Sequence, residues 1–243
     1  MYKRQEPDTI WMSSLGEFFD YNVGEGEDTD AINLVAATGD VNEIRYMRSN
    51  RDLQIFTLSD ELYVPTYLNQ AITPTNAQIR KQTPFGSEFV LPTSIDGATI
   101  FVERGGRAVR EYIYSDAEDA YISTAISTVA THLIKSPVDI AVVHSGFNTA
   151  ESYAALVMAD GDMALFSSNR AEKRAAWTGL TSQGSYKAAT AIGDRLFTYQ
   201  QDVNNNYVLS EFLDDIGLDN YLYVAYGSGC LLYTSDAADD SLR

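Results

Sequence analysis

The adjacent His144 and Ser145 are the residues of this chain best suited to nucleophilic chemistry. A serine nucleophile needs a base within hydrogen-bond reach and an acid that orients the base. The surrounding letters, "VVHSGFN", differ from the G-x-S-x-G turn of the α/β-hydrolases, and neighbours on a strand point to opposite faces. We therefore predict no catalytic role for this pair. The other histidine, His132, lies beside an apolar stripe and is expected to be a partly buried packing residue.

Paired carboxylates suggest glycoside hydrolysis, and they occur at Asp116, Glu118 and Asp119 and again at Asp214 and Asp215. The chain holds 34 acidic residues, so pairs of this kind are expected by number alone. They give little support to an enzyme.

The segment "NVGEGEDTDAIN" gathers Glu25, Glu27, Asp28 and Asp30 in a glycine-rich stretch. Several carboxylates close together are what Ca²⁺ requires. The EF-hand spacing is absent, because the twelfth position counted from Asp28 is Gly39 rather than glutamate. A solvated acidic loop is therefore favoured over a cation site at residues 25–30.

The sequence contains no phosphate-binding loop, dinucleotide fingerprint or zinc spacing. Trp11 and Trp177 are interpreted as strand packing residues, with sugar stacking by an exposed Trp177 as the alternative. The sequence thus predicts no catalytic, cofactor-binding or metal-binding residue, no cofactor and no enzymatic activity.

The net charge of −17 repels phosphate backbones, so specific nucleic-acid binding is not expected. The longest apolar runs, such as "IAVV" and "AALVM", are far too short to span a bilayer, so no membrane partner is expected either.

The only cysteine, Cys230, opens the acidic tail "CLLYTSDAADD". This tail can be encoded by TGT CTC TTA TAC ACA TCT and the codons that follow. The head "MYKRQ" can be encoded by GTG TAT AAG AGA CAG, whose reverse complement repeats the start of the tail. Both ends therefore resemble a transposon-end adapter from sequencing-library preparation, translated by accident. A natural acidic tail is the alternative.

On this interpretation residues 1–5 and 230–243 are not native, and residues 6–229 are a fragment of a longer protein. These ends contain three basic and three acidic residues, so the net charge of −17 is unchanged when they are removed. The redox chemistry of Cys230 then carries no meaning for function.

Alternating apolar and polar residues recur around tight turns in residues 6–229. Predicted turns lie at Asp96-Gly97, Gly105-Gly106, Asp160-Gly161 and Gly193-Asp194, and also at residues 50–52 and 204–206. Asp-Gly and Gly-Gly pairs supply the positive φ angles of hairpins, so each unit is expected to hold three or four antiparallel strands. The units recur at intervals between 34 and 64 residues, in the range of propeller blades.

The fold class predicted is all-β, a partial β-propeller, with a β-sandwich made of the same hairpins as the alternative. One inserted helix is expected at about residues 122–135, where Ile122, Ile126, Val129, Leu133 and Ile134 form an apolar stripe. The segment "LNQAITPTNAQIRKQTPFGSE" is expected to be a loop that crosses between blades, because it has two prolines and scattered polar residues.

The order of several segments resembles the propeller region of tailed-phage virion tail proteins, such as the nozzle proteins of short-tailed phages (tail tubular protein B). The resemblance covers nearly all of residues 11–222 and rests on an ordered set rather than on one motif. Its segments are "WMSSLGEFFDYNVG", "ITPTNAQIRKQTPFGSEFVLPTSIDGATIFVERGGRAVREYIYS", "AYISTAISTVATHLI", "VMADGDMALFSSNRAEKRAAW" and "DRLFTYQQDVNNNYVLSEFLDD".

This resemblance implies a structural virion protein, made in the bacterial host cytoplasm and assembled as a homo-oligomeric ring on other tail and head–tail connector proteins. DNA would pass through the assembly without specific binding. It implies no catalytic residues. The open alternatives are a cellular propeller that acts as an interaction scaffold, and a propeller that binds glycans or is an enzyme.

Overall fold

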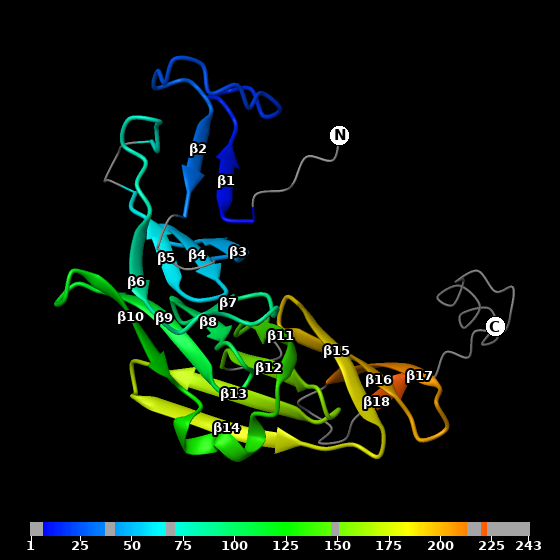
Figure 1. Cartoon of the computed structure of the whole chain (residues 1–243). Helices are drawn as coiled ribbons and strands as arrows, with labels where there is room; N and C mark the ends of the chain where they lie inside the picture. The colour runs from blue at the N-terminus through cyan, green and yellow to red at the C-terminus, as the bar shows by residue number, and fades with distance from the viewer. Residues whose placement is uncertain (1–6, 37–41, 67–70, 147–150, 213–219, 223–243) are drawn as a thin grey trace, which may run out of the picture.

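The structure is a computed structural model that describes residues 7–36, 42–66, 71–146, 151–212 and 220–222. The ends interpreted as adapter-derived, residues 1–5 and 230–243 with Cys230, lie outside these ranges. Within the described residues no helix is long and apolar enough to cross a membrane. The chain is all-β, as predicted (Figure 1).

The described residues form one two-stranded ribbon and four sheets of four strands each. The ribbon holds β1 (Thr9–Met12) and β2 (Ile32–Val35). The first sheet holds β3 (Ile44–Ser49), β4 (Leu53–Thr57), β5 (Glu61–Val64) and β6 (Arg80–Thr83), and the second holds β7 (Thr93–Ile95), β8 (Ala98–Val102), β9 (Val109–Ser115) and β10 (Ala120–Ala125). The third holds β11 (Pro137–Val143), β12 (Tyr153–Met158), β13 (Met163–Asn169) and β14 (Arg174–Leu180). The fourth holds β15 (Ser185–Ile192), β16 (Arg195–Gln201), β17 (Tyr207–Phe212) and β18 (Asn220–Leu222).

Every four-stranded sheet is an antiparallel meander whose spatial order follows the chain. Six of the turns in the meanders lie where the sequence predicts them, whereas the β4–β5, β9–β10 and β13–β14 turns were not predicted. Asp96 and Gly97 both have positive φ, 48° and 77°, and join β7 to β8 in a two-residue hairpin. Gly161 (φ 93°) and Gly193 (φ 64°) lie in the turns that join β12 to β13 and β15 to β16. The predicted three- or four-stranded units are confirmed.

The predicted helix at residues 122–135 is wrong. Residues 120–125 form β10, in which Ile122 pairs with Ile113 of β9, and only Thr128–Leu133 form a short 3₁₀ helix, η1. The β-branched side chains of Ile122, Thr124 and Val129 lose rotamer freedom in a helix and fit the pleat of a sheet. Pairing with the adjacent β9 therefore overrides the apolar stripe at helical spacing.

The predicted crossing loop also contains a strand. Residues 80–83 form β6, which pairs with β5 at the edge of the first sheet. Its sequence, "RKQT", is polar because the strand lies at an edge and its side chains are mostly exposed or half-buried. Strands are predicted from alternating apolar and polar residues, and β6 contains no apolar residue, so its sequence did not indicate a strand.

The apolar core is divided among the interfaces of successive sheets. Leu156 of β12 packs with Ile100 of β8 between the second and third sheets, whereas its neighbour Val157 packs with Leu196 of β16 between the third and fourth. Both faces of β12 are buried, which explains its continuous apolar sequence "AALVM". Ile10 of β1 packs with Leu62 of β5, so the ribbon rests on the first sheet.

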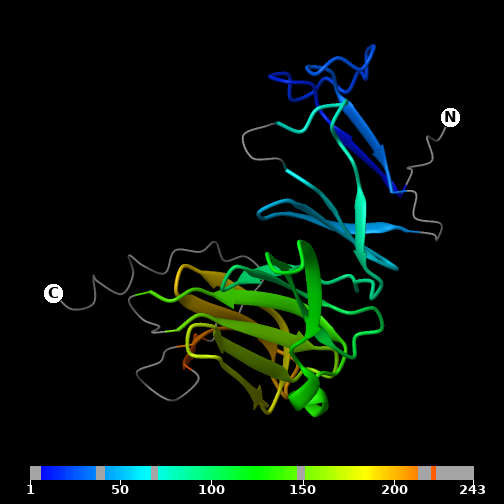
Figure 2. The same ribbon diagram turned by 90° about the vertical axis from the view of Figure 1, so that its left-hand side faces the viewer.

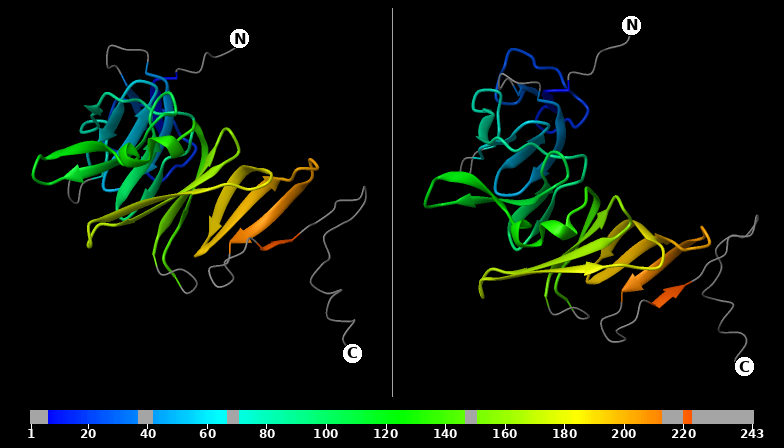
Figure 3. Two further views of the ribbon diagram at one scale, coloured as in Figure 1. Left: turned by 90° about the horizontal axis from the view of Figure 1, so that it is seen from below. Right: turned by 60° about the horizontal axis from the view of Figure 1, so that its bottom comes forward.

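The first strands of the sheets lie against one another. β11 contacts both β7 and β15, and Arg48 of β3 donates hydrogen bonds to Ser94 Oγ (2.9 Å) and to the carbonyl of Pro92 beside β7. Figure 2 shows the ribbon and the first sheet above the other three sheets, and Figure 3 shows the second, third and fourth sheets succeeding one another in chain order. The described strands form five sheets, whereas a sandwich has two facing sheets.

Candidate functional site

Within the part of the chain that the structure describes, His144 and Ser145 are not joined to each other in a catalytic group. His144 and Ser145 follow the end of β11 and are both exposed. The Ser145 backbone N–H donates to Ser152 Oγ at 3.0 Å. Ser145 also lines a shallow polar groove with Glu151, Ser152 and Asp96, but His144 does not line this groove. The geometry gives no support to a serine nucleophile activated by the adjacent histidine.

The remaining histidine and the tryptophans have mixed outcomes. His132 lies in η1 and is exposed, so its predicted partial burial is wrong. Trp177 confirms the packing interpretation, because its ring lies 4.7 Å from that of Phe166 and its Nε1 donates to the Ile126 carbonyl at 3.0 Å. Trp11 does not confirm the packing interpretation, because this residue of β1 is 47% exposed.

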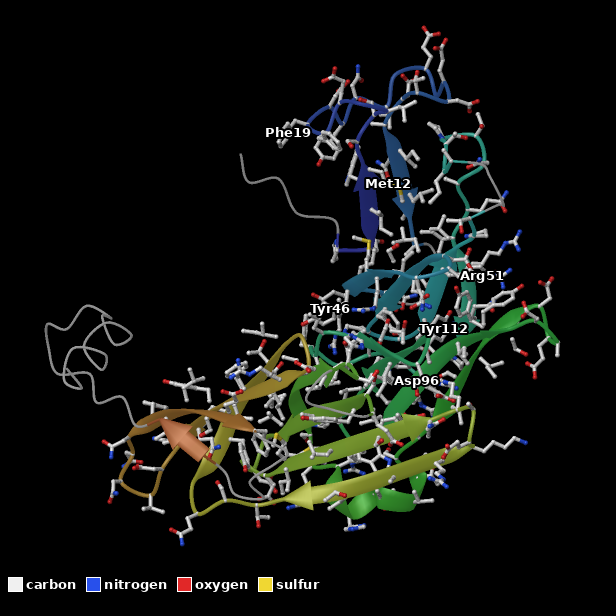
Figure 4. The ribbon with its side chains drawn as sticks, turned by 180° about the vertical axis from the view of Figure 1, so that it is seen from behind. Met12, Phe19, Tyr46, Arg51, Asp96 and Tyr112 are labelled. Carbon is white, nitrogen blue, oxygen red and sulfur yellow. The ribbon has the colours of Figure 1, made fainter. Side chains whose placement is uncertain are left out.

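The carboxylate pairs have separate structural roles. Asp116, in the β9–β10 turn, forms a 3.2 Å ion pair with Arg51 of the first sheet (Figure 4). The Arg51 guanidinium also lies 3.8 Å from the centroid of the Tyr114 ring. Asp119 accepts a hydrogen bond from the Tyr114 hydroxyl, and Glu118 is exposed. Asp214 and Asp215 lie outside the described residues.

The acidic loop is held by its own backbone amides. The Asp30 carboxylate accepts hydrogen bonds from the N–H groups of Gly26 (3.0 Å) and Glu27 (2.8 Å), and Asp28 accepts one from the Thr75 hydroxyl (2.8 Å). Within the described part of the chain no group of three His, Cys, Asp or Glu side chains is placed to hold a metal ion.

The structure instead gathers buried polar side chains, with the half-buried Thr83, between the first and second sheets. We call this group the interface cluster: Asp52, Gln54, Glu61, Thr83, Thr99, Tyr112 and Tyr121. Thr99 of β8 donates to Gln54 Oε1 of β4 at 2.6 Å. Tyr121 of β10 donates to Asp52 Oδ2 at 2.8 Å, while Thr66 donates from its backbone N–H and its hydroxyl to Asp52 Oδ1. The bonds from Thr99 and Tyr121 connect the two sheets, and those from Thr66 hold Asp52 in place.

Glu61 is the fully buried acid of this cluster. Its Oε2 accepts hydrogen bonds from the Thr83 hydroxyl and from the Phe85 N–H, and its Oε1 has no hydrogen-bond partner among the described residues. Burial raises the pKa of Glu61 to about 7, and the hydrogen bonds from Thr83 and Phe85 and the charge of Arg110 oppose this rise only in part. The carboxyl group is therefore partly protonated near neutral pH.

Aromatic rings pack together in the same interface. Tyr112 stacks on Tyr121 with 4.6 Å between ring centroids and meets Phe56 edge-on at 5.8 Å. Burial and the negative charge of Glu61 raise the pKa of Tyr112, so its hydroxyl stays neutral. Tyr112 Oη and Gln54 Nε2 have no hydrogen-bond partner within the described residues. Buried polar atoms left in this way are destabilising, so the cluster is sensitive to any change in its neighbours.

The interface cluster was not predicted from sequence. Glu61 opens β5, in the letters "SDELYV", and a charged residue at the start of an apolar strand is usually exposed. Its burial depends on β6 and β9, which lie far from it in the sequence. Chemically, the cluster can bind a proton and fix two sheets together. A family-model search and a search of curated proteins both find no match for this chain.

Proposed function

We propose that this chain is part of a non-enzymatic structural protein of a tailed-phage tail, built from β-propeller blades. The observation that carries the proposal is the succession of four antiparallel meanders of four strands each, in chain order. The first strand β11 contacts the first strands β7 and β15, and Arg48 of β3 donates a hydrogen bond to Ser94 of β7. Propeller blades are four-stranded meanders placed side by side in this way. The ordered segments described above connect this architecture with the tail proteins.

The outer face of the last sheet also supports a propeller. Leu196 is buried in the cluster that this sheet shares with the third sheet, and Val208, on the same face, is also buried. On the opposite side Tyr199, Tyr207 and Leu209 are between 42% and 55% exposed, and the two tyrosine rings stack with 5.1 Å between centroids. An exposed apolar sheet face of this kind suits burial by another blade.

The charge is compatible with a wall past which DNA moves. A basic wall would bind the phosphates of DNA, because binding releases counterions. The free energy needed to detach the DNA would then rise with each contact. A protein of net charge −17 repels the duplex instead. In this proposal the intact protein assembles as a ring on other tail and head–tail connector proteins of the virion.

The location of the gene and of the protein tests the proposal. In the source genome the reading frame should lie among genes for portal, capsid and other tail proteins. Mass spectrometry of purified phage particles should detect peptides of this chain, for example the tryptic peptide of residues 175–187 that contains Trp177. A neighbourhood of metabolic genes, or particles that lack the protein, would contradict a role in the virion.

A further inference from the structure

The connection between β1 and β2, residues 13–31, projects from the body of the molecule beyond the ribbon (Figures 1 and 4). Its tip exposes large apolar side chains: Leu15 is 74% exposed, Phe18 79% and Phe19 95%. Scattered apolar residues are common on protein surfaces, but adjacent phenylalanines with this exposure are not. Figure 4 shows Phe19 at the outer end of the ribbon, directed away from the sheets.

The fold of this connection is fixed by its own hydrogen bonds. The Ser14 N–H donates to the Asp20 carbonyl at 2.9 Å, the Asp20 N–H donates to the Glu17 carbonyl at 3.1 Å, and the Leu15 N–H donates to the Thr29 carbonyl at 3.0 Å. These bonds hold Phe18 and Phe19 in a tight turn that points outward. A loop ordered before binding loses less conformational entropy when it docks.

The charge of the loop restricts what it can bind. Residues 13–30 hold six acidic residues and no lysine, arginine or histidine. Nucleic acids and anionic membrane surfaces are therefore repelled. As a partner for the loop itself, a second copy of this chain fits less well than a basic surface, because loop and copy are both acidic. A basic protein surface is the partner that both the charges and the aromatic side chains fit.

We propose that residues 13–30, the aromatic–acidic loop, insert Phe18 and Phe19 into an apolar pocket of a different protein whose rim carries lysine and arginine. The aromatic rings fill the pocket, and the surrounding carboxylates steer the approach and pair with the rim. The ribbon acts as a stalk anchored to the first sheet by Ile10 and Ala36. This proposal is independent of the phage assignment, since it rests only on the exposure, order and charge of the loop.

Site-specific cross-linking identifies the partner. Benzoylphenylalanine is placed at position 19 of the full chain, which is mixed with an extract of the cells that make the protein and irradiated. The matched control carries the same group at position 203, where Val203 is 66% exposed in the turn between β16 and β17. A protein cross-linked only from position 19 is identified by mass spectrometry and purified.

Binding of that purified protein to the full chain then decides the matter. We expect Phe18→Ala/Phe19→Ala to raise the dissociation constant at least about tenfold. The control Ile192→Ala/Val203→Ala should leave it unchanged. Glu17→Gln/Glu25→Gln/Glu27→Gln should slow association and reduce its salt dependence. Circular dichroism checks that each variant is folded.

Several outcomes would overturn the proposal. They are cross-linking to a second copy alone, no cross-link specific to position 19, equal affinity of the Phe18→Ala/Phe19→Ala variant, or a partner whose contact surface is acidic. Binding of the loop to phosphatidylglycerol vesicles or to duplex DNA, lost in the same variant, would replace the protein partner with a membrane or a nucleic acid.

Discussion

The hydroxyl of Tyr121, in the last strand of the second sheet, donates a 2.8 Å hydrogen bond to the carboxylate of Asp52, in the first turn of the first sheet. The two residues are separated by 69 positions in the sequence. Asp52 is 5% exposed and Tyr121 is 4% exposed, so the bond is shielded from solvent. It connects two sheets that share no backbone ladder.

Removal of this hydroxyl should destabilise the protein. Tyr121→Phe leaves a buried carboxylate with one partner fewer, and we expect a loss of about 1.5–3 kcal/mol in the free energy of unfolding. The matched control is Tyr114→Phe, whose hydroxyl donates to the exposed Asp119, and little change is expected there. Urea denaturation measures both variants. Equal midpoints for the two variants would show that the Asp52 bond contributes nothing.

The Glu61 carboxyl group should make stability depend on pH. Its pKa is raised from 4.5 to about 7 in the folded protein, so the folded state holds this proton more tightly than the unfolded chain. Stability is therefore greatest below about pH 4.5 for this group and is lost as the pH rises through about 7. The loss amounts to about 3 kcal/mol above pH 8.

Glu61→Gln tests this prediction, because the neutral amide keeps an oxygen that can accept from Thr83. The variant should be more stable than the wild type at pH 8.5 and about equally stable at pH 5. The difference between the two proteins isolates this residue from all other titrating groups. A difference that does not change with pH would show that Glu61 has an ordinary pKa.

Sequence reasoning succeeded where one or two neighbouring residues decide the structure. The hairpin at Asp96-Gly97 requires two positive φ angles, and aspartate followed by glycine is a pair that favours them. Six turns of the four-stranded sheets were predicted, whereas others, such as residues 116–119 between β9 and β10, were not. It failed at residues 122–135, where an apolar stripe at helical spacing competed with the strand preference of β-branched residues and with pairing to β9. A distant partner decided that competition.

The interface cluster and the aromatic–acidic loop depend on tertiary structure in opposite ways. Glu61 is of a type that is usually exposed, and it is buried between β6, whose Thr83 pairs with it, and the second sheet, whose Tyr112 and Arg110 lie near enough to interact with its charge. Phe19 is of a type that is usually buried, and it is exposed because the ribbon carries it away from every sheet. Neither placement has a local sequence signal.

Asp139 should contribute to the contact between the third and fourth sheets. Its Oδ2 accepts a 2.9 Å hydrogen bond from the Ala189 N–H of β15, next to the register shift between Tyr186 and Ala188. Asp139→Ala leaves that N–H without its acceptor and should cost about 1–3 kcal/mol. Asp139→Asn retains an acceptor oxygen and should recover much of the loss. Thermal denaturation compares the three proteins, and identical melting temperatures would exclude this role.

The last prediction compares two glycines with similar backbone angles and different surroundings. Gly86 has a φ of 71° and Gly97 a φ of 77°, so alanine is strained at both positions. A Cβ on Gly97 meets nothing within 4 Å, whereas a Cβ on Gly86 would overlap the Leu58 carbonyl oxygen. Gly97→Ala should therefore cost about 1–2 kcal/mol, the strain alone. Gly86→Ala should cost about 1–3 kcal/mol more, because the segment between β6 and β7 must move away from the β4–β5 turn.

This segment also holds Phe85, whose N–H donates to Glu61, so the Gly86→Ala variant should also alter the pH dependence of stability. Urea denaturation at pH 6 and pH 8 measures both effects, and equal costs at the two glycines would show that Gly86 is not packed against Leu58.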